Sequence, residues 1–269
     1  MKDRILNVLI TGAASGIGAQ SAILFAENGH NVYGIDVSPC PDCKGITAYK
    51  ADITDGEALN GIKNELESRG IIIDLIINVA GVHTMASLAE DDIAHMKRVL
   101  EINLVGTLTV NRIFHSLLAT HGRIVIVTSE VAPLAPMPFN GLYNVSKTAL
   151  DCYAQALRQE IGLIGQKVIT IRPGAIETPL AHGSLKATQA LADRTRLYKK
   201  QASRFLGLTK SFMGTPIKPS KRAALIYKAA ISEHPRTVYS KHRNPGLVLL
   251  SILPADLQCF IIKMLLGNT

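Results

Sequence analysis

A glycine-rich turn between a predicted strand and a predicted helix constrains this sequence most. Residues 5–11 form an apolar run typical of a buried strand, and the turn T-G-A-A-S-G-I-G, residues 11–18, completes it. A helical pattern then continues to the Asn28-Gly29 pair, a common helix stop. Glycines in such a turn let a pyrophosphate approach the backbone, and the helix N-terminus supplies free N–H groups and a favourable dipole. The turn therefore predicts a dinucleotide site.

The second predicted strand ends at a carboxylate. Asp36 closes residues 31–36 and stands eighteen positions after Gly18. A carboxylate here accepts hydrogen bonds from both ribose hydroxyls of a dinucleotide and repels a 2′-phosphate. Neither the glycine turn nor the residues directly after Asp36 include Lys or Arg. The sequence therefore favours NAD over NADP as cofactor.

Predicted strands alternate with helical patterns along the chain, as in a parallel sheet that helices cover on both faces. The predicted strands are residues 5–11, 31–36, 46–51, 73–78, 123–128 and 167–171, with a further short strand at 237–240. No linker, repeat or low-complexity segment interrupts the first 178 residues. We therefore expect an α/β fold, a single Rossmann-type doubly wound parallel sheet, with residues 1–269 as one domain.

Three further residues predict acid–base chemistry beside the dinucleotide. Tyr143 and Lys147 stand four positions apart at the start of a predicted helix, so their side chains share one face. A nearby ammonium favours the phenolate, which lowers the pKa of a phenol from about 10 and makes it a usable proton donor and acceptor. Ser129 follows the buried strand at 124–127, and ligands of open α/β sheets bind at the carboxyl ends of strands.

These motifs together resemble those of one family, the classical short-chain dehydrogenases/reductases. Its T-G-x-x-x-G-x-G turn is matched by residues 11–18, and its N-N-A-G element by N-V-A-G at 78–81, with valine for the second asparagine. The resemblance covers residues 5–178 in the family's order and spacing. It implies a catalytic tetrad of Asn103, Ser129, Tyr143 and Lys147. Asn103 is implied to lie at a break in a long helix, where its backbone binds a water that links Lys147 to solvent.

The resemblance also implies the cofactor contacts. Asp52 and Ile53 match the place where the family meets the adenine ring, and Pro173-Gly174 opens the stretch that holds the nicotinamide end. The expected set is Thr11, Gly12, Ser15, Gly16, Ile17, Gly18, Asp36, Asp52, Ile53, Asn78, Ala80, Gly81, Tyr143, Lys147, Pro173, Gly174, Ile176 and Thr178.

Charge is unevenly distributed. Residues 181–269 hold fifteen Lys and Arg against three Asp and Glu, a net +12, whereas residues 1–180 hold fourteen against eighteen, a net −4. This favours an anionic partner for the tail: a membrane surface, an acidic carrier or an acidic substrate. A solvated helical face over residues 186–204 is the alternative. Nucleic acid is not expected, because no aromatic platform or recognised binding module accompanies the charge.

Residues 241–269 add an apolar extension. Pro254, Asp256 and Lys263 interrupt it, so neither half reaches the roughly twenty residues that span a bilayer. We expect it to cap a substrate pocket, pack against another subunit, or lie in a membrane interface. The first strand begins too early for a preceding signal peptide, and four cysteines make no disulfide scaffold. We therefore expect a cytoplasmic location, with membrane association through the extension as the alternative.

Three other polar features of the sequence remain, namely a cysteine pair, a histidine and a glutamate. Cys40 and Cys43 have metal-ligand spacing, but nothing completes a zinc set, so we expect no metal. We expect His83, two residues after Gly81, to be a solvated or hydrogen-bonded bystander, with a position at the mouth of the pocket as the alternative. Glu130, next to Ser129, is a candidate substrate contact, although an outward, solvated position is the more common one.

The expected activity is reversible hydride transfer between NAD and a secondary alcohol or ketone, the reaction of a short-chain alcohol dehydrogenase or ketoreductase. In this family the region at 181–218 covers the substrate, and its composition, with the apolar tail, favours a steroid, retinoid or lipid-like compound over a sugar. A 3-oxoacyl carrier-protein reductase is the enzymatic alternative, and a nucleotide-sensing binding protein the other. By analogy, homodimers or homotetramers would form through the long helices at 91–119 and 142–164.

Overall fold

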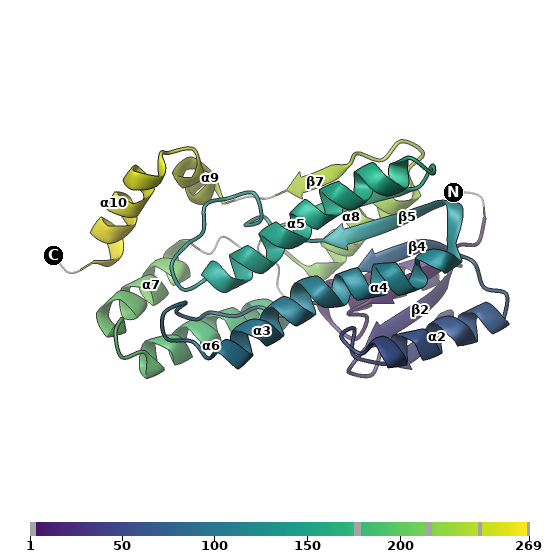
Figure 1. The fold of residues 1–269 in the computed structure, drawn as a ribbon, viewed down its shortest axis with the longest axis horizontal. Coiled ribbons are helices and arrows are strands. Elements are labelled where there is room, and N and C mark those ends of the chain that lie inside the picture. The colour runs from purple at the N-terminus through teal and green to yellow at the C-terminus, as the bar shows by residue number, and fades with distance from the viewer. Residues whose placement is uncertain (1–3, 175–178, 213–216, 242–243, 268–269) are drawn as a thin grey trace.

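The computed structural model describes residues 4–174, 179–212, 217–241 and 244–267, which are built around one sheet (Figure 1). The strands are β1 Asn7–Thr11, β2 Asn31–Asp36, β3 Ile46–Lys50, β4 Ile73–Asn78, β5 Leu118–Val127, β6 Lys167–Pro173 and β7 Val238–Lys241. They lie in the order β3-β2-β1-β4-β5-β6-β7, and every neighbouring pair is parallel. The order reverses between β1 and β4, as in a doubly wound Rossmann-type sheet. The predicted fold class is confirmed.

Helices cover both faces of the sheet. They are α1 Gly16–Glu27, α2 Gly56–Ser68, α3 Ile93–Leu100, α4 Thr107–Phe114, α5 Gly141–Gly162, α6 Pro179–Arg194, α7 Lys199–Phe212, α8 Pro219–Ile231, α9 Pro245–Ser251 and α10 Ala255–Leu266. Helices α2, α4 and α5 pack on one face, and α1 and α8 on the other. In the part of the chain that the structure describes, no helix combines the length and apolar composition needed to cross a bilayer.

Strand β1 shows how the sequence produces this layering. Val8 and Ile10 point towards α1 and α8 and share a core cluster with Phe25. Leu9 points to the opposite face and shares a second cluster with Leu150 of α5. Because alternate side chains of a strand point to opposite faces, a strand covered on both sides needs a continuous apolar run. Residues 5–11 have that run.

Two predicted boundaries are wrong, for related reasons. Strand β5 begins at Leu118 rather than at Arg123, because Leu118 pairs with Ile73 before an irregularity restores the register at Leu75 and Arg123. The helix predicted over 91–119 therefore ends earlier. It is also divided, since a π-helical turn at Glu101–Gly106 separates α3 from α4. The break in the long helix implied by the resemblance is present in the structure.

Helices α6, α7, α9 and α10 lie together beyond the carboxyl ends of the strands (Figure 1). A third apolar cluster joins α6, α7 and α10 to the loops of the sheet. It includes Met85, Phe139, Leu191, Phe205 and Leu266. Phe139 has a φ of 66° and packs edge-on against Phe205 of α7, with 5.5 Å between ring centres. The predicted short strand near 237–240 is β7, so the apolar tail begins only after the sheet is complete.

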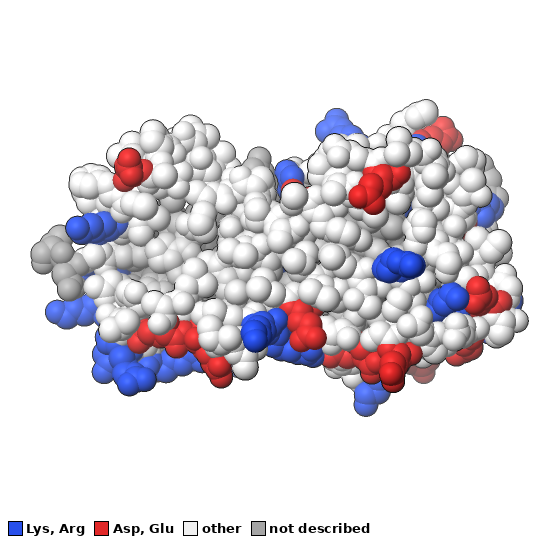
Figure 2. All heavy atoms as spheres, viewed as in Figure 1, with Lys and Arg blue, Asp and Glu red and all other residues white. Residues whose placement is uncertain are grey.

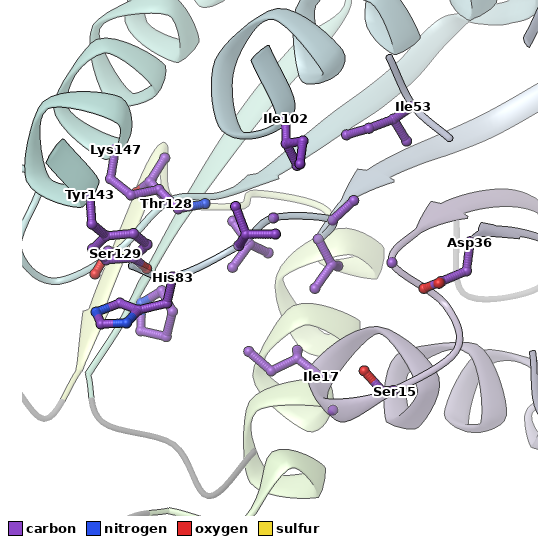
Figure 3. A pocket seen from close by; sticks show the side chains of 18 of the residues that line it. Ser15, Ile17, Asp36, Ile53, His83, Ile102, Thr128, Ser129, Tyr143 and Lys147 are labelled. Atoms are coloured by element: carbon purple, nitrogen blue, oxygen red, sulfur yellow. The ribbon is translucent and has the colours of Figure 1, made fainter. Parts of the chain in front are cut away.

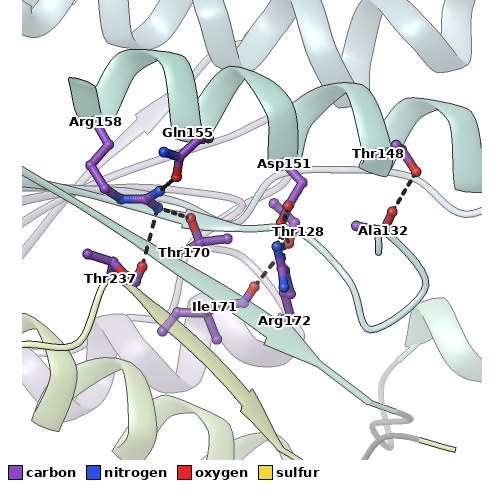
Figure 4. Close-up of polar contacts among 10 residues, drawn as sticks. All are labelled: Thr128, Ala132, Thr148, Asp151, Gln155, Arg158, Thr170, Ile171, Arg172 and Thr237. Atoms are coloured by element: carbon purple, nitrogen blue, oxygen red, sulfur yellow. Dashed lines mark hydrogen bonds and ion pairs between the residues drawn. The ribbon is translucent and has the colours of Figure 1, made fainter. Parts of the chain in front are cut away.

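Polar contacts fix α5 on the sheet (Figure 4). The Asp151 carboxylate accepts hydrogen bonds from Arg172 of β6, at 2.8 Å from Nε and 2.5 Å from Nη2, and from the Thr128 hydroxyl at 3.1 Å. Two turns further along the helix, Arg158 Nη2 donates to the Thr170 hydroxyl at 2.6 Å. These contacts hold the middle and the end of α5 on β6 and on the end of β5.

We predict that Asp151→Ala lowers the free energy of unfolding by about 2–3 kcal/mol, because it leaves the Arg172 guanidinium without its bidentate carboxylate. The two side chains are only 16% and 22% exposed. A matched control is Glu67→Ala, which breaks an exposed pair with Lys63 and should cost less than about 1 kcal/mol. Urea denaturation measures both, and equal losses would contradict the anchoring role of Asp151.

Candidate functional site

A cavity of about 490 Å³ lies at the carboxyl ends of the central strands (Figure 3). Its walls come from the turn after β1, the end of β2, the loops after β4 and β5, and the start of α5. It lies where the strand order reverses, the usual ligand position in such sheets. The predicted residues in its wall are Gly12, Ser15, Gly16, Ile17, Asp36, Asp52, Ile53, Ala80, Gly81, Ser129, Tyr143, Lys147, Pro173 and Gly174.

Four other predicted residues, Thr11, Gly18, Asn78 and Asn103, are not part of that wall. The buried Thr11 hydroxyl accepts hydrogen bonds from the N–H groups of Val79 and Ala80, at 3.3 and 3.4 Å. The Asn78 amide, also buried, donates to Asn111 Oδ1 at 2.8 Å. These side chains therefore hold the loop after β4 rather than face a ligand. The two remaining predicted contacts, Ile176 and Thr178, lie outside the described residues.

The glycine turn has the form that a pyrophosphate requires. Gly12 has a φ of +71°, and a Cβ built on it would lie 2.7 Å from the Ala80 nitrogen. A Cβ on Gly18 would lie 1.9 Å from the Gly12 carbonyl oxygen. Helix α1 starts at Gly16, and within the described residues the side chain of its N-cap, Ser15, makes no capping hydrogen bond. The first N–H groups of α1 thus border the cavity, which suits an anion.

Asp36, at the end of β2, binds the opposite side of the glycine turn. Its Oδ2 accepts a hydrogen bond from the Ala14 N–H at 3.0 Å, and its Oδ1 one from the Ser38 N–H at 2.9 Å. A carboxylate has about four acceptor positions, so two remain for ribose hydroxyls. The side chain borders the cavity beside Val37 (Figure 3).

Asp52 lies at the same end of the cavity and has a basic neighbour that the sequence did not indicate. Arg98 of α3 places Nη2 2.6 Å from Asp52 Oδ2 and also borders the cavity. Burial acts to raise the pKa of Asp52, but hydrogen bonds from Thr54 and Arg98 outweigh it and hold the pKa below its usual value. The two residues are 46 positions apart, so only the packing of α3 reveals the pair.

Ser129, Tyr143 and Lys147 gather at the opposite end of the cavity (Figure 3). All three are buried. The Lys147 ammonium lies 5.9 Å from the centre of the Tyr143 ring. A Cβ on Gly81 would come within 3.2 Å of Lys147 Nζ, so the glycine leaves room for the amine. The fold brings the predicted acid–base residues together.

The pKa of Tyr143 moves opposite to the predicted direction. Burial raises it to about 12, the negative charge of Glu130 acts in the same direction, and a hydrogen bond with Ser129 opposes them. Burial also lowers the pKa of Lys147 to about 8. The prediction considered the attraction between ammonium and phenolate but not the desolvation of both groups. At pH 7 the phenol is therefore protonated and the amine charged.

Asn103 lies inside the π-helical turn and is buried. Its Nδ2 donates to the Val82 carbonyl at 2.9 Å and to the Ser146 hydroxyl at 3.0 Å, and its Oδ1 accepts from the Val82 N–H at 2.7 Å. The side chain thus joins the loop after β4 to helix α5. The bond to Ser146 holds α5 one residue before Lys147.

Two residues differ from their sequence expectations. His83 is not a bystander: its ring centre lies 4.5 Å from that of Tyr143, and burial lowers its pKa to about 4 despite a hydrogen bond with Asn140. It is therefore neutral at pH 7. Glu130 does not extend into solvent, because its Oε2 accepts a hydrogen bond from the Asn244 N–H at 2.7 Å. Neither position follows from the sequence, since loop residues meet these neighbours only after folding.

The Cys40–Cys43 pair is not part of a metal centre in the described part of the chain. Cys40 and Cys43 are both free and half-buried. No group of three His, Cys, Asp or Glu side chains among the described residues is arranged to hold a metal ion.

Comparisons with known proteins agree with this geometry. A family model described as short chain dehydrogenase matches residues 6–189. The NADPH-dependent 1-acyldihydroxyacetone phosphate reductase of Schizosaccharomyces pombe is 30% identical over 199 residues, which cover 71% of this chain and 67% of that protein. The 3-ketodihydrosphingosine reductase of Bacteroides thetaiotaomicron is 27% identical over 173 residues and 64% of each chain. A short-chain dehydrogenase/reductase from Burkholderia phymatum, solved with NAD, superposes with a TM-score of 0.75 at 20% identity over 95% of both chains.

The lowered pKa of Lys147 predicts a pH-dependent contribution to stability. Below about pH 8 the amine is charged in both folded and unfolded chains, and its burial costs free energy. Between about pH 8 and the ordinary value of 10.5 only the folded protein has lost the proton, so the cost disappears as the pH rises. The free energy of unfolding of the wild type, relative to Lys147→Met, should therefore rise by about 3 kcal/mol from pH 7 to pH 10.5.

Urea denaturation across this pH range measures the difference, in which other titrating groups cancel. Lys50→Met, which removes an exposed lysine instead of a buried one, is the control. A Lys147 difference that stayed constant would refute the lowered pKa.

Proposed function

The chain belongs to the short-chain dehydrogenase family, and we propose from this that it transfers a hydride between a hydrophobic ketone or secondary alcohol and a nicotinamide dinucleotide. One observation carries the proposal. A single cavity joins a glycine turn that excludes side chains to a buried Tyr143, which keeps its proton at neutral pH. Residues 1–269 would act as one domain, with 181–218 covering the substrate.

The cavity residues fit the cofactor of this family. The turn at Gly12 and the start of α1 would hold the pyrophosphate, Asp36 the adenosine ribose, and Asp52 with Ile53 the adenine. The stretch from Pro173 to Thr178 would hold the nicotinamide end. When bound, the nicotinamide supplies or accepts the hydride at the substrate carbon.

Ser129 and Tyr143 would act on the substrate oxygen. In the reductive direction the Ser129 hydroxyl donates a hydrogen bond to the carbonyl oxygen, and Tyr143 transfers its phenolic proton to that oxygen as negative charge develops there. The charged Lys147 then stabilises the phenolate that remains. Asn103 would keep Lys147 in place, and its backbone in the π-helical turn would bind the water that returns a proton.

The pKa values favour reduction over oxidation. Oxidation requires the phenolate before the reaction starts, and pH 7 lies about five units below the Tyr143 pKa of about 12. Reduction starts from the protonated phenol that is present at pH 7. The two relatives named above are both described as reductases, which supports the same direction.

Two observations support a lipid-like substrate. The loop before Asn140, which borders the cavity, belongs to an apolar cluster with α6, α7 and α10 through Phe139 and Met85. Both named relatives are reductases of lipid-like ketones, one of a 1-acyldihydroxyacetone phosphate and one of 3-ketodihydrosphingosine. A long-chain keto compound is therefore favoured over a sugar, and over a steroid or retinoid.

Cofactor preference is a separate part of the proposal. Asp36 supports NAD, because its charge repels a 2′-phosphate. Arg98 is the one cation that borders the cavity near Asp36 among the described residues, and it is already paired with Asp52. The yeast relative uses NADPH and the Burkholderia structure holds NAD, so the family accepts both.

The proposed oligomeric state rests on analogy with the family, and the proposed cellular compartment rests on the state of the cysteines. We propose a homodimer or homotetramer that forms through α4 and α5. Val105, in the π-helical turn just before α4, and Val145, in α5, are exposed apolar residues. All four cysteines are free thiols, which supports a reducing, cytoplasmic compartment.

Tyr143→Phe should lower kcat for ketone reduction by about a thousandfold, because it keeps the ring but removes the transferable proton. The assay follows nicotinamide oxidation over a panel of 3-keto lipids, carrier-linked 3-oxoacyl groups and steroid ketones. Binding of the reduced cofactor, measured by fluorescence, should not change. The control is Tyr153→Phe on the same helix, whose hydroxyl accepts only a 3.3 Å hydrogen bond from Asn111. Equal turnover by Tyr143→Phe and wild type would exclude Tyr143 as the acid.

Asp36→Asn should narrow the preference for NADH over NADPH by at least about tenfold in kcat/KM, since it removes the charge but keeps an acceptor oxygen. Asp42→Asn removes an exposed carboxylate nearby and should leave the ratio unchanged. If both variants retained the wild-type ratio, Asp36 would have no part in cofactor choice.

A further inference from the structure

The C-terminal helix α10 presents an apolar stripe to solvent. Its members follow the spacing i, i+3, i+4, i+7 and i+8, which places them on one side of the helix. They are Leu257, Phe260, Ile261, Met264 and Leu265. Four of them are between 42% and 59% exposed, and Ile261 is half-buried. Exposed apolar patches of this kind mark interaction surfaces.

The opposite side of α10 is already used. Leu266 is buried and Ile262 partly buried, and both pack in the cluster with Phe205 and Leu208 of α7. The helix is thus apolar on two sides, and the fold covers one of them. Two further exposed side chains lie three positions apart, Leu249 in the preceding helix α9 and Ile252 directly after it. Figure 2 shows few charged side chains over α9 and α10 on this side of the molecule.

Exposed cations lie on the helices next to this stripe. They are Lys186, Arg194, Arg196, Lys199, Lys200 and Arg204, all exposed, on α6, α7 and the link between them. Asp193 is the one acidic residue between positions 186 and 209. The ion pairs found among the described residues all lie elsewhere. Lys and Arg side chains gather at the end of the molecule where α6 meets α7, and Asp and Glu side chains lie beside them (Figure 2), since Glu90, Asp91 and Asp92 border the same groove as Arg194 and Arg196.

The combination favours a lipid surface over a second copy of the chain. Pairing two copies stripe to stripe would bring two sets of these cations close together, with no acidic patch on the same helices to offset the repulsion. An anionic bilayer offers both an apolar layer and negative headgroups. We propose that α9 and α10 dock in the interface of an anionic membrane, with the cations of α6 and α7 at the headgroups.

Hydrogen bonds connect the two ends of α9 to the loop that follows β5 and carries Ser129. The Ala135 N–H donates a hydrogen bond to the Ser251 hydroxyl of α9 at 2.8 Å, and the Asn244 N–H donates to Glu130, which follows Ser129. Docking would therefore hold the cavity next to the bilayer from which a lipid-like ketone arrives. That last step rests on the proposed function, whereas docking itself does not.

Flotation with vesicles tests the proposal directly. The full chain should float with vesicles of equimolar phosphatidylcholine and phosphatidylserine, and much less with phosphatidylcholine alone. The double variant Phe260→Glu, Met264→Glu should lower the bound fraction at least about tenfold. The double variant Lys199→Gln, Lys200→Gln should weaken binding to the anionic vesicles and reduce its sensitivity to salt.

The matched control is Leu163→Glu, Ile164→Glu, which changes two exposed apolar residues just after α5, at the other end of the molecule. It should float like the wild type. Thermal unfolding checks that each variant is folded; should the α10 variant unfold, the α7 variant and the salt dependence still decide the question.

Three results would overturn the proposal. One is a wild type that does not float with anionic vesicles, and another is an α10 variant that floats as well as the wild type. The third is a wild-type dimer that does not float and becomes a monomer on Phe260→Glu, Met264→Glu, which would assign the stripe to a second copy. Flotation without ketone reductase activity would instead refute the proposed function and leave docking intact.

Discussion

The contact between the turn after β1 and the loop after β4 is the constraint on which the site depends. Gly12 lies so close to Ala80 that a single Cβ would collide with backbone. This closeness follows from the parallel pairing of β1 with β4 at the point where the strand order reverses. Connections leave the sheet in opposite directions there and open a cavity that a dinucleotide can enter. The glycines, the α1 N-terminus and Asp36 matter chemically because this geometry aligns them along one wall.

Burial controls the acid–base end of the same cavity. Desolvation raises the pKa of Tyr143 and lowers that of Lys147. The site therefore holds a protonated phenol beside a charged amine at neutral pH. His83, neutral for the same reason, packs against the phenol ring. A protonated acid at a buried position is suited to quench negative charge on a carbonyl oxygen, which is the role that we propose for Tyr143.

The helices beyond the sheet connect this chemistry to the tail. The apolar cluster around Phe139 joins the loop beside the cavity to α6, α7 and α10. Glu130 holds the start of α9 through the Asn244 N–H. The tail is thus attached to the loop that follows β5, and its uncovered stripe lies on α10, which packs against the cation-bearing helix α7. Substrate choice and surface binding are therefore expected to depend on the same group of helices.

The sequence by itself determined the fold class, most strand positions and the residues around the cavity, because these depend on local periodicity and on glycines at fixed spacing. The helix break at Asn103 followed only from the family resemblance, and tertiary structure alone decided the early start of β5, the Arg98–Asp52 pair and the contacts of His83 and Glu130. It also reversed the predicted pKa shift of Tyr143. Each of these depends on which distant groups share a buried space, and desolvation and long-range packing leave no signal in the local order of residues.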